Sequence, residues 1–510
     1  MTNANDNVNP AEKKQEKVRP KPAEMLVELA KGAELCHSSE RIGYACVFVN
    51  KHRETYRIKS TSFKIWLASM YHAEFKKVPS QEAIKEAINT IDGLAIFEAP
   101  ERVLYRRVAG DTSRVVIDLG DSDWSTVVVT SDGWEVKPSP ETTFVRSSSM
   151  EALPMPCRGG NAVELLAELV NVPPEQMPLL VAWMIGAFCP SGPYPVLGVH
   201  GEQGSAKSTL CRIVKRLIDP NKADVRSAPR SEQDLFIAGQ NSWIVSLENL
   251  SSISTWLSDS LCRISTGAGF AARTLYSDGE ETIFQVQRPI MINGIGELAS
   301  RGDLLERSVL LDLPALKPGA RLTERELNRN AVEQAGRIFG SLLDAVSSAI
   351  RHLGDVDETD LPRMADFTLW ALAGLRHFEM ADEFLEAYRA NQQGATETAI
   401  EASMIGRPLL EFLKLGDFEG NASNLLKALE KFKPDNVYAL KYWPGSPRKL
   451  TSDLTRISPN LRALGYSVEL GLPRRMIRIA KTTLHGSHGC LLYTSPSPRD
   501  RTRSRMPSSA

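Results

Sequence analysis

The sequence predicts a multidomain protein with an α/β domain at its centre, a small α+β domain before it and a winged-helix-like domain after it. The chain has 510 residues, which is enough for about three domains. Residues 161–320 alternate helical periodicity with short apolar runs, a pattern typical of α/β structure. Within this region an apolar run, a glycine-rich loop and a helical pattern follow one another directly.

The pattern along the chain divides it into six segments. A Pro/Gly-rich linker, LPMPCRGG, separates the first folded domain from the second. We expect a disordered tail over 1–21, an α+β accessory domain over 22–150, the α/β core over 161–320, a helical lid over 321–405, a winged-helix-like domain over 406–482, and a non-native or disordered tail over 483–510.

The last of these segments does not resemble evolved protein. From Cys490 the chain reads CLLYTSPSPRDRTRSRMPSSA, which is similar to a translated sequencing adapter. We therefore exclude its four arginines from any argument about nucleic-acid binding.

Composition excludes several classes of protein. The 61 Lys and Arg residues against 62 Asp and Glu residues give a net charge of −1, so overall charge indicates no partner. The longest apolar run, from Leu179 to Cys189, is too short to span a bilayer. The N-terminus lacks the apolar stretch of a secretory signal, and the seven cysteines form no CxxC pair. We expect a cytoplasmic protein with reduced thiols.

The strongest motif is the glycine-rich loop. An apolar strand pattern ends at His200, and a helical pattern with Leu210 and Leu217 on its apolar face follows the loop. Backbone N–H groups of such a loop and the helix N-terminus bind phosphate, a lysine reaches the β- and γ-phosphates, and the next hydroxyl binds Mg²⁺. The loop consists of Gly201, Glu202, Gln203, Gly204, Ser205, Ala206, Lys207, Ser208 and Thr209. Ala206 stands where the second glycine is usual; the alternative is a Gly/Ser turn with a solvated lysine.

Three further strand ends carry polar side chains suited to phosphoryl transfer. Glu248 follows the apolar run Trp243–Leu247 and is the expected Mg²⁺ ligand, with Ser208. Asn293 ends the next apolar run and is a candidate sensor of the γ-phosphate. Arg307 precedes another apolar run and is a candidate arginine finger, which would stabilise the charge of the γ-phosphate bound by a neighbouring subunit. The alternatives are a surface carboxylate, a turn asparagine and a surface ion pair.

This ordered set resembles the core of an AAA+ ATPase. It is most similar to superfamily 3 helicases and phage-type primase-helicase ATPases, and to ATP-binding replication proteins of bacteriophages and integrated mobile elements. The similar stretches are LGVHGEQGSAKST, SLENLSSIS, LCRISTGAGFAARTLYSDGEE and QRPIMINGIGELASRGDLLERSVLLDLP. Family members usually carry Asp at the Glu248 position.

The resemblance implies ATP and Mg²⁺ as cofactors, hydrolysis, and a homo-oligomeric ring. It also implies that residues 267–281 form a hairpin in the ring channel, where Arg273 would contact a phosphate and Tyr276 would stack on a base. Arg363, in the helical segment, is the corresponding candidate for a second sensor. A plain β-hairpin and a surface arginine are the alternatives.

The region 406–481 is locally basic, with 14 Lys and Arg residues against 7 Asp and Glu residues. Two helical patterns followed by two strand patterns are similar to a winged helix, with Pro459 expected to break or kink the second helix. The expected contacts with duplex DNA are Arg448, Lys449 and Arg456 on the helix and Arg474 and Arg475 at the wing tip. A protein-binding domain or a solvated basic face is the alternative.

We therefore expect an ATP-dependent DNA motor in the replication of a phage or mobile element. One alternative is a slow ATPase switch that loads or regulates a helicase, which is favoured by Asn249, since a second acid often follows the Mg²⁺ ligand. The other is a non-enzymatic DNA-binding adaptor with a degenerate nucleotide site. The carboxylates Asp111, Asp118, Asp121 and Asp123 do not predict a polymerase site, because only Asp118 falls within a clear strand pattern.

Overall fold

The computed structural model divides into two compact units, residues 1–399 and 400–510. It describes residues 20–50, 52–138, 142–273, 281–284, 286–294, 302–316, 323–359, 361–401, 403–433, 443–472 and 476–482, with the backbone alone for 270–273 and 281–284. Short 3₁₀ turns are found at Pro174–Gln176, Leu353–Asp355, Arg376–Phe378 and Glu430–Phe432.

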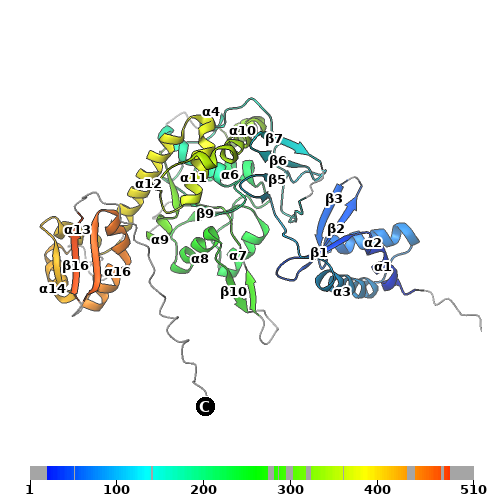
Figure 1. Cartoon of the computed structure of the whole chain (residues 1–510), viewed down its shortest axis with the longest axis horizontal. Coiled ribbons are helices and arrows are strands. Elements are labelled where there is room, and N and C mark those ends of the chain that lie inside the picture. The colour runs from blue at the N-terminus through cyan, green and yellow to red at the C-terminus, as the bar shows by residue number, and fades with distance from the viewer. Residues whose placement is uncertain are drawn as a thin grey trace, which may run out of the picture. The chain divides into compact units, whose positions relative to one another are not determined.

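The first unit begins with a small α+β module (Figure 1). Its elements are α1 (Pro22–Ala30), β1 (Glu34–His37), β2 (Gly43–Val49), β3 (His52–Arg57), α2 (Thr61–Phe75) and α3 (Gln81–Phe97). The strands form an antiparallel sheet in the order β1-β2-β3. Ser80 Oγ accepts the Ala83 N–H at 3.2 Å and so caps the N-terminus of α3. Leu26, Phe63 and Ile88 belong to the buried core of this module.

A second antiparallel sheet follows, and it differs from the predicted domain over 22–150. Its strands, in sheet order, are β4 (Val108–Gly110), β5 (Val115–Asp118), β6 (Thr126–Thr130) and β7 (Gly133–Lys137). Val127 and Val129 are fully buried in the core of the central domain and not in that of α1–α3. Trp134 Nε1 donates to Asp344 Oδ1 at 2.9 Å, which ties this sheet to the helix α10. The alternation of valines predicts the strands but not the surface that covers them.

The central domain contains a parallel sheet between two layers of helices. Its elements are α4 (Ala162–Ala167), α5 (Met177–Gly186), β8 (Val196–Gly201), α6 (Lys207–Ile218), α7 (Glu232–Asn241), β9 (Val245–Leu250), α8 (Thr255–Thr266), β10 (Phe270–Arg273), β11 (Glu281–Phe284), β12 (Ile290–Gly294), α9 (Gly302–Leu305) and β13 (Ser308–Leu313). The sheet order is β13-β8-β12-β9, with every pairing parallel. β10 and β11 form a separate antiparallel hairpin.

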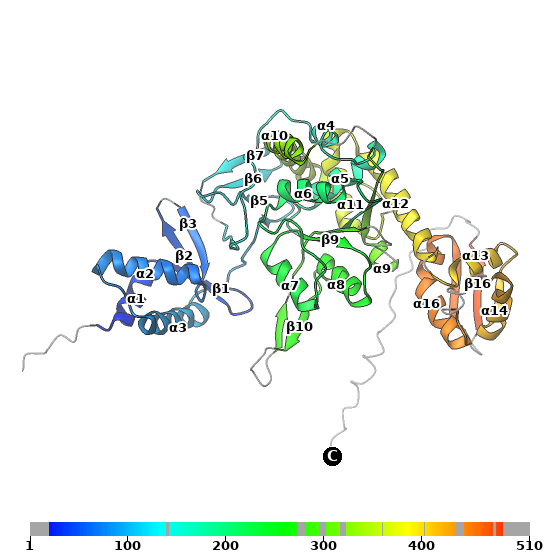
Figure 2. The same cartoon turned by 180° about the vertical axis from the view of Figure 1, so that it is seen from behind.

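Alternation along the sheet strands places side chains in two different cores. Leu197, Val199 and Met291 pack with residues of α5, α6 and α10. Val196, Ile290 and Ile292 face the other way and pack with residues of α7 and α8. Figures 1 and 2 show α7 and α8 on one side of the sheet and α6, α10 and α11 on the other. Both faces are covered, as expected for a parallel sheet.

Long helices complete the first unit. They are α10 (Glu324–His352), α11 (Ala365–Leu375) and α12 (Ala381–Glu401). Thr323 begins α10 with a capping box, in which its Oγ1 accepts the Glu326 N–H at 3.2 Å. α5 is buried on all sides. It is joined to α11 by the indole of Trp370, whose Nε1 donates to Ile185 O at 3.2 Å.

The second unit is a small domain with a three-stranded antiparallel sheet in the order β14-β16-β15. Its elements are α13 (Gly406–Leu413), β14 (Phe418–Asn421), α14 (Ala422–Leu429), α16 (Pro447–Ala463), β15 (Tyr466–Leu472) and β16 (Met476–Lys481). We expected a break or a kink at Pro459; α16 continues through this residue, so the break is wrong. Leu450, Leu454 and Leu461 bury one face of α16 in the core of this unit.

Candidate functional site

The glycine-rich loop connects β8 to α6, as the sequence predicts. Gly201 and Gly204 have φ angles of +139° and +82°. A Cβ on Gly201 would lie 2.5 Å from Leu313 O and 2.6 Å from Ser205 Oγ. Glycine is therefore required at position 201 both by its backbone conformation and by its close neighbours.

Ala206 is the residue of this loop that departs from the usual motif. It has φ +68° and ψ +25°, the left-handed conformation, at the position just before α6. A residue with a Cβ in this conformation costs about 1–2 kcal/mol relative to glycine. The structure thus gives the reason why glycine is usual here: the loop keeps its turn with alanine, but under strain.

Replacing Ala206 by glycine should stabilise the protein. The gain from relieved strain exceeds the added entropy of the unfolded chain, so we expect the free energy of unfolding to rise by about 0.5–1 kcal/mol. Thermal unfolding measures this change. The matched control is Ala331→Gly within α10, where the same substitution should lower stability by about 1 kcal/mol. A loss of stability in both variants would contradict the assignment of strain to Ala206.

Lys207, the first residue of α6, turns back onto the loop. Its Nζ donates to Gly201 O and to Glu202 O, both at 2.7 Å, and lies 3.5 Å from Ser205 Oγ. The side chain is 9% exposed, and burial lowers the pKa of Lys207. Ser208 and Thr209 are half-buried in the first turn of α6, and Gln203 is exposed. The cation is thus held on the loop by neutral carbonyl groups, which an anion can displace.

Glu248 and Asn293 lie at the same edge of the sheet as this loop. β8, β9 and β12 are parallel, so their carboxyl ends meet at one edge. Asn293 is 2% exposed; its Oδ1 accepts the Asn249 N–H at 2.9 Å, and its Nδ2 donates to Cys211 Sγ at 3.3 Å. Asn293 therefore bridges the end of β9 and the helix that begins at Lys207.

Glu248 is half-buried next to this bridge. Burial, together with the nearby Glu248 carboxylate, raises the pKa of the Cys211 thiol to about 12. Cys211 lies one turn after Lys207 on α6, so Glu248 is near enough to influence a thiol on the helix that follows the loop. Lys207, Glu248 and Asn293 are thus brought to one edge of the sheet. Asn249 is exposed, with φ +57°.

Arg307 lies at the opposite edge of the sheet. Its carbonyl oxygen accepts the N–H of Val196, the first residue of β8, at 2.9 Å. At about 3.3 Å per residue, the length of β8 places Arg307 about 17 Å from the loop of its own chain. Its guanidinium donates to Asp303 O at 2.8 Å and pairs with the Asp303 carboxylate. Arg307 is therefore separated from Lys207 within one chain.

Arg363, the candidate second sensor, also lies at this opposite edge, beside Arg307 and away from the loop of its own chain. It pairs with Glu306 and, at 3.3 Å, with Asp303. Periodicity in the helical region gives no information about which end of the sheet a loop approaches.

The candidate DNA contacts are only partly within the described residues. β10 and β11 form the expected hairpin, which projects from the central domain (Figure 1). In the register of its two strands, the backbone of Arg273 is opposite that of Glu281. The side chain of Arg273, and all of Tyr276, Arg474 and Arg475, lie outside the described residues. Arg448 and Arg456 are exposed on α16, and Lys449 pairs with Asp453 at 2.8 Å.

A cavity of about 540 Å³, which no sequence motif marks, adjoins the loop. Gly204, Ala206 and Thr209 line it, together with Asn171 and Leu327 of α10. Asn171 Nδ2 donates to Ser205 O at 3.2 Å and to Pro314 O at 2.7 Å. This side chain fixes the loop to the end of β13, a contact between residues far apart in the sequence.

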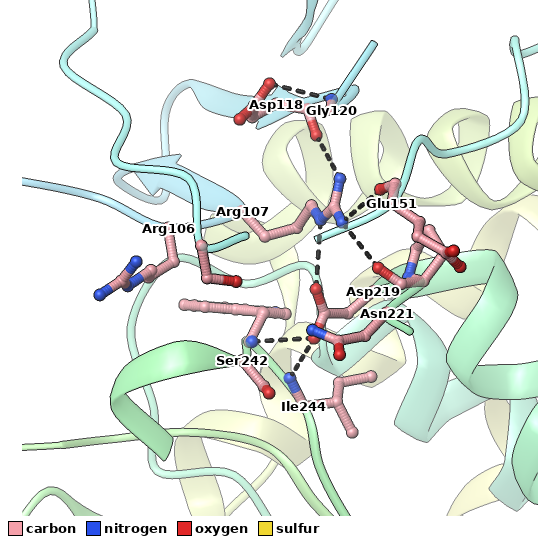
Figure 3. Close-up of polar contacts among 12 residues, drawn as sticks. Arg106, Arg107, Asp118, Gly120, Glu151, Asp219, Asn221, Ser242 and Ile244 are labelled. Atoms are coloured by element: carbon pink, nitrogen blue, oxygen red, sulfur yellow. Dashed lines mark hydrogen bonds and ion pairs between the residues drawn. The ribbon is translucent and has the colours of Figure 1, made fainter. Parts of the chain in front are cut away.

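A buried charge cluster lies at the far end of α6 (Figure 3), and no sequence motif predicts it. The carboxylate of Asp219 accepts from Lys215 Nζ at 2.7 Å, from Arg107 Nε at 3.2 Å, and from the N–H groups of Trp243 and Ile244 at 2.8 and 3.0 Å. The Arg107 guanidinium also donates to Asp118 O, Glu151 O and Pro220 O. The cluster joins the sheet β4–β7 to α6.

Burial alone would raise the pKa of Asp219. The attraction of Lys215 and Arg107, with the hydrogen bonds, outweighs it and lowers the pKa to about 2. Asp219 is therefore charged at neutral pH and serves as the shared counterion of two buried cations.

Asp118, the carboxylate within a predicted strand, has a structural role. Arg146 pairs with Asp118 at 2.6 Å and lies over the ring of Trp124.

In the part of the chain that the structure describes, no group of three His, Cys, Asp or Glu side chains is placed to hold a metal ion. The cysteines at 36, 46, 157, 189, 211 and 262 are free thiols. Among the described helices, none is both long and apolar enough to cross a membrane.

Comparison with known proteins now places the chain. Residues 163–397 match the family model described as actinomycete integrative conjugative element replication protein, and residues 405–495 match the model of the C-terminal domain of the same proteins. Together these matches cover more than half of the sequence, and they define a replication protein of mobile elements. The chain belongs to the RepA family of actinomycete integrative conjugative elements. The expected link to mobile-element replication is thereby confirmed.

Similarity to other proteins is weak. No curated protein matches the chain. An apo structure of the NrS-1 C-terminal region aligns at 12% identity and a TM-score of 0.38, over 90% of this chain and 98% of its own. A second apo structure of that region aligns at 14% identity and the same TM-score, over 91% of this chain and all of its own. The family assignment therefore rests on the family models.

Proposed function

We propose that this replication protein is an ATP-dependent DNA motor with an AAA+ core of the superfamily 3 type. One observation carries the proposal: Lys207 in its glycine-rich loop, Glu248 and Asn293 lie at one edge of a parallel sheet, in which β12 separates β8 from β9. A lysine on a curled loop at a helix N-terminus suits a triphosphate, and a carboxylate beside it suits Mg²⁺. The 540 Å³ cavity beside Ala206 has room for a nucleoside.

In this proposal the chain's own residues have defined roles. Loop N–H groups and Lys207 bind the β- and γ-phosphates, while Ser208 and Glu248 hold Mg²⁺ directly or through water. Asn293 contacts the γ-phosphate or the attacking water from its position between α6 and β9. Arg307, at the far edge, would act on the γ-phosphate of a neighbouring subunit, which requires a closed assembly.

The proposed DNA contacts occupy two places. The hairpin β10–β11, with Arg273 and Tyr276, would hold a single strand in the channel of the assembly. The winged-helix-like second unit, through Arg448, Lys449 and Arg456, would hold duplex DNA by salt-sensitive phosphate contacts.

One observation favours a slower switch as a second candidate. Asn249 follows Glu248 at the place where a second acid would polarise water, and its N–H is bound by Asn293. A protein that binds ATP but turns it over slowly would act as a loader or regulator of a helicase. An adaptor with a degenerate site is favoured by the strained Ala206 and by Glu248, which stands where family members usually carry Asp.

ATP turnover with and without DNA distinguishes these candidates. A motor should hydrolyse ATP at about 1 s⁻¹ or faster, with stimulation by single-stranded DNA and ATP-dependent strand displacement. A switch would bind ATP with little turnover and no displacement. Failure to bind ATP at micromolar concentration would eliminate both.

A further inference from the structure

A large polar cleft lies in the first unit, away from the glycine-rich loop. Its volume is about 660 Å³. The lining comes from the turn after β1, the ends of β3 and α2, the segments 101–106 and 145–148, the end of α7, and the residues just before β12. Because β12 begins at Ile290, the cleft is at the amino edge of the parallel sheet, opposite Lys207.

Unneutralised positive charge distinguishes this cleft. Five arginines line it, against Glu40 and Glu101. Of these arginines, Arg102 pairs with Glu34 and Arg146 with Asp118. The other three have no carboxylate partner within ion-pair distance among the described residues; they are Arg57, Arg106 and Arg288. Such a surface attracts an anion.

Two of these arginines are held in place by neutral groups. Arg106 Nη1 donates to Val145 O at 3.2 Å. Arg288 donates to Gly239 O and Ser242 O at 3.1 and 3.2 Å. Burial lowers the pKa of both guanidinium groups; that of Arg288 falls to about 10, which leaves Arg288 charged at neutral pH. Figure 3 shows Arg106 pointing away from Arg107 and from the buried cluster around Asp219.

The rest of the lining suits a nucleic acid. Tyr44, Tyr56 and Tyr105 provide aromatic rings, and Ser60 and Ser147 are among several hydroxyl groups. Arginines for phosphates together with aromatic rings for bases are the usual composition of single-strand binding grooves.

The position of the cleft also suits the binding of a single strand of nucleic acid. β11 ends at Phe284, and Val286 and Arg288, which follow it, line the cleft. The cleft is therefore at the base of the projecting hairpin, where a strand held by the hairpin would leave or enter the domain.

We propose that this cleft binds a segment of single-stranded nucleic acid, with Arg57, Arg106 and Arg288 facing its phosphates. The site is separate from the hairpin and from the second unit. The inference rests on the proposed function only in taking DNA as the polyanion; the charge of the cleft is independent of ATP hydrolysis.

Fluorescence anisotropy with a labelled oligothymidylate of about 16 nucleotides tests the proposal on the full chain. Arg57→Glu and Arg106→Gln should each raise the Kd for the oligonucleotide about fivefold and reduce the salt slope by about 0.7 per lost phosphate contact. The matched control is Lys85→Glu, an exposed lysine of α3 outside the cleft, which should leave the Kd unchanged. Arg57 is exposed, so its variant remains informative if Arg106→Gln fails to fold.

ATP is the second arm, since a mononucleotide offers the same phosphate chemistry. Unchanged ATP affinity in both variants, with weaker oligonucleotide binding, supports the strand site. Weaker ATP binding with unchanged oligonucleotide binding overturns it in favour of a nucleotide pocket, and no change in either ligand overturns it altogether. ATP hydrolysis in the same preparations is scored separately, so that its absence tells against the proposed motor and not against the cleft.

Discussion

Subunits with Lys207→Ala and subunits with Arg307→Ala should each lose ATP hydrolysis, and mixing the two should restore part of it. Lys207 lies on the loop and Arg307 about 17 Å away at the other edge of the sheet, so each variant damages a different half of a shared site. We expect a loss of at least about a hundredfold for Lys207→Ala and about a thousandfold for Arg307→Ala.

The mixture provides the sharper measurement. An equimolar random mixture pairs an intact loop with an intact Arg307 in about a quarter of its interfaces. Steady-state hydrolysis should recover to about that share of the parent rate. The controls are Lys222→Ala, at an exposed lysine after α6, and Arg376→Ala, at an exposed arginine that pairs with Asp355; both should retain the parent rate. No recovery on mixing would contradict the role of Arg307 across an interface, and a parent-like rate in Lys207→Ala would contradict the site itself.

Asp219→Asn should strongly destabilise the central domain. The substitution removes the charge that neutralises Lys215 and Arg107. In either orientation the new amide N–H₂ faces a donor, which is Arg107 Nε on one side and the backbone N–H groups of Trp243 and Ile244 on the other. Breaking a buried ion pair by removing one partner lowers the free energy of unfolding by about 3–5 kcal/mol. Urea unfolding followed by tryptophan fluorescence is a suitable measurement, because Trp243 contacts the cluster.

The pH dependence of this effect follows from the pKa of Asp219. Its folded-state pKa, about 2, lies below the ordinary value of 3.8, so its stabilisation is complete above about pH 5 and declines as the pH falls toward 2. The stability difference between parent and Asp219→Asn should therefore shrink over that range. The control is Asp224→Asn, whose carboxylate is 3.8 Å from Arg216 and more exposed; it should cost less than about 1 kcal/mol at any pH. Equal effects of the two substitutions would contradict the role assigned to the buried cluster.

Local patterns in the sequence predicted what depends on neighbouring residues. The helix after the loop ends at Ile218, before Pro220, and Leu210 and Leu217 are buried as its periodicity requires. The strand expected over Trp243–Leu247 is present as β9, although it begins two residues later than expected. The parallel pairing of three strands then brings Lys207, Glu248 and Asn293 together.

What could not be predicted depends on contacts across long stretches of sequence. Arg107 and Asp219 are 112 residues apart, and neither stands in a motif that marks it. Asn171 reaches the loop from a turn 34 residues earlier. The burial of β4–β7 against α10, and the position of Arg363 beside Glu306, likewise depend on which surface the chain returns to. Periodicity defines an apolar face but not its neighbour.

The neighbouring arginines at the edge of the cleft have a structural consequence. One peptide bond joins Arg106, which lines the cleft, to Arg107, which is bound to Asp219 at the end of α6. α6 has 12 residues and thus forms a rod about 18 Å long, with Lys207 at its other end. The cleft and the glycine-rich loop are therefore connected by one peptide bond, one buried ion pair and the length of one helix.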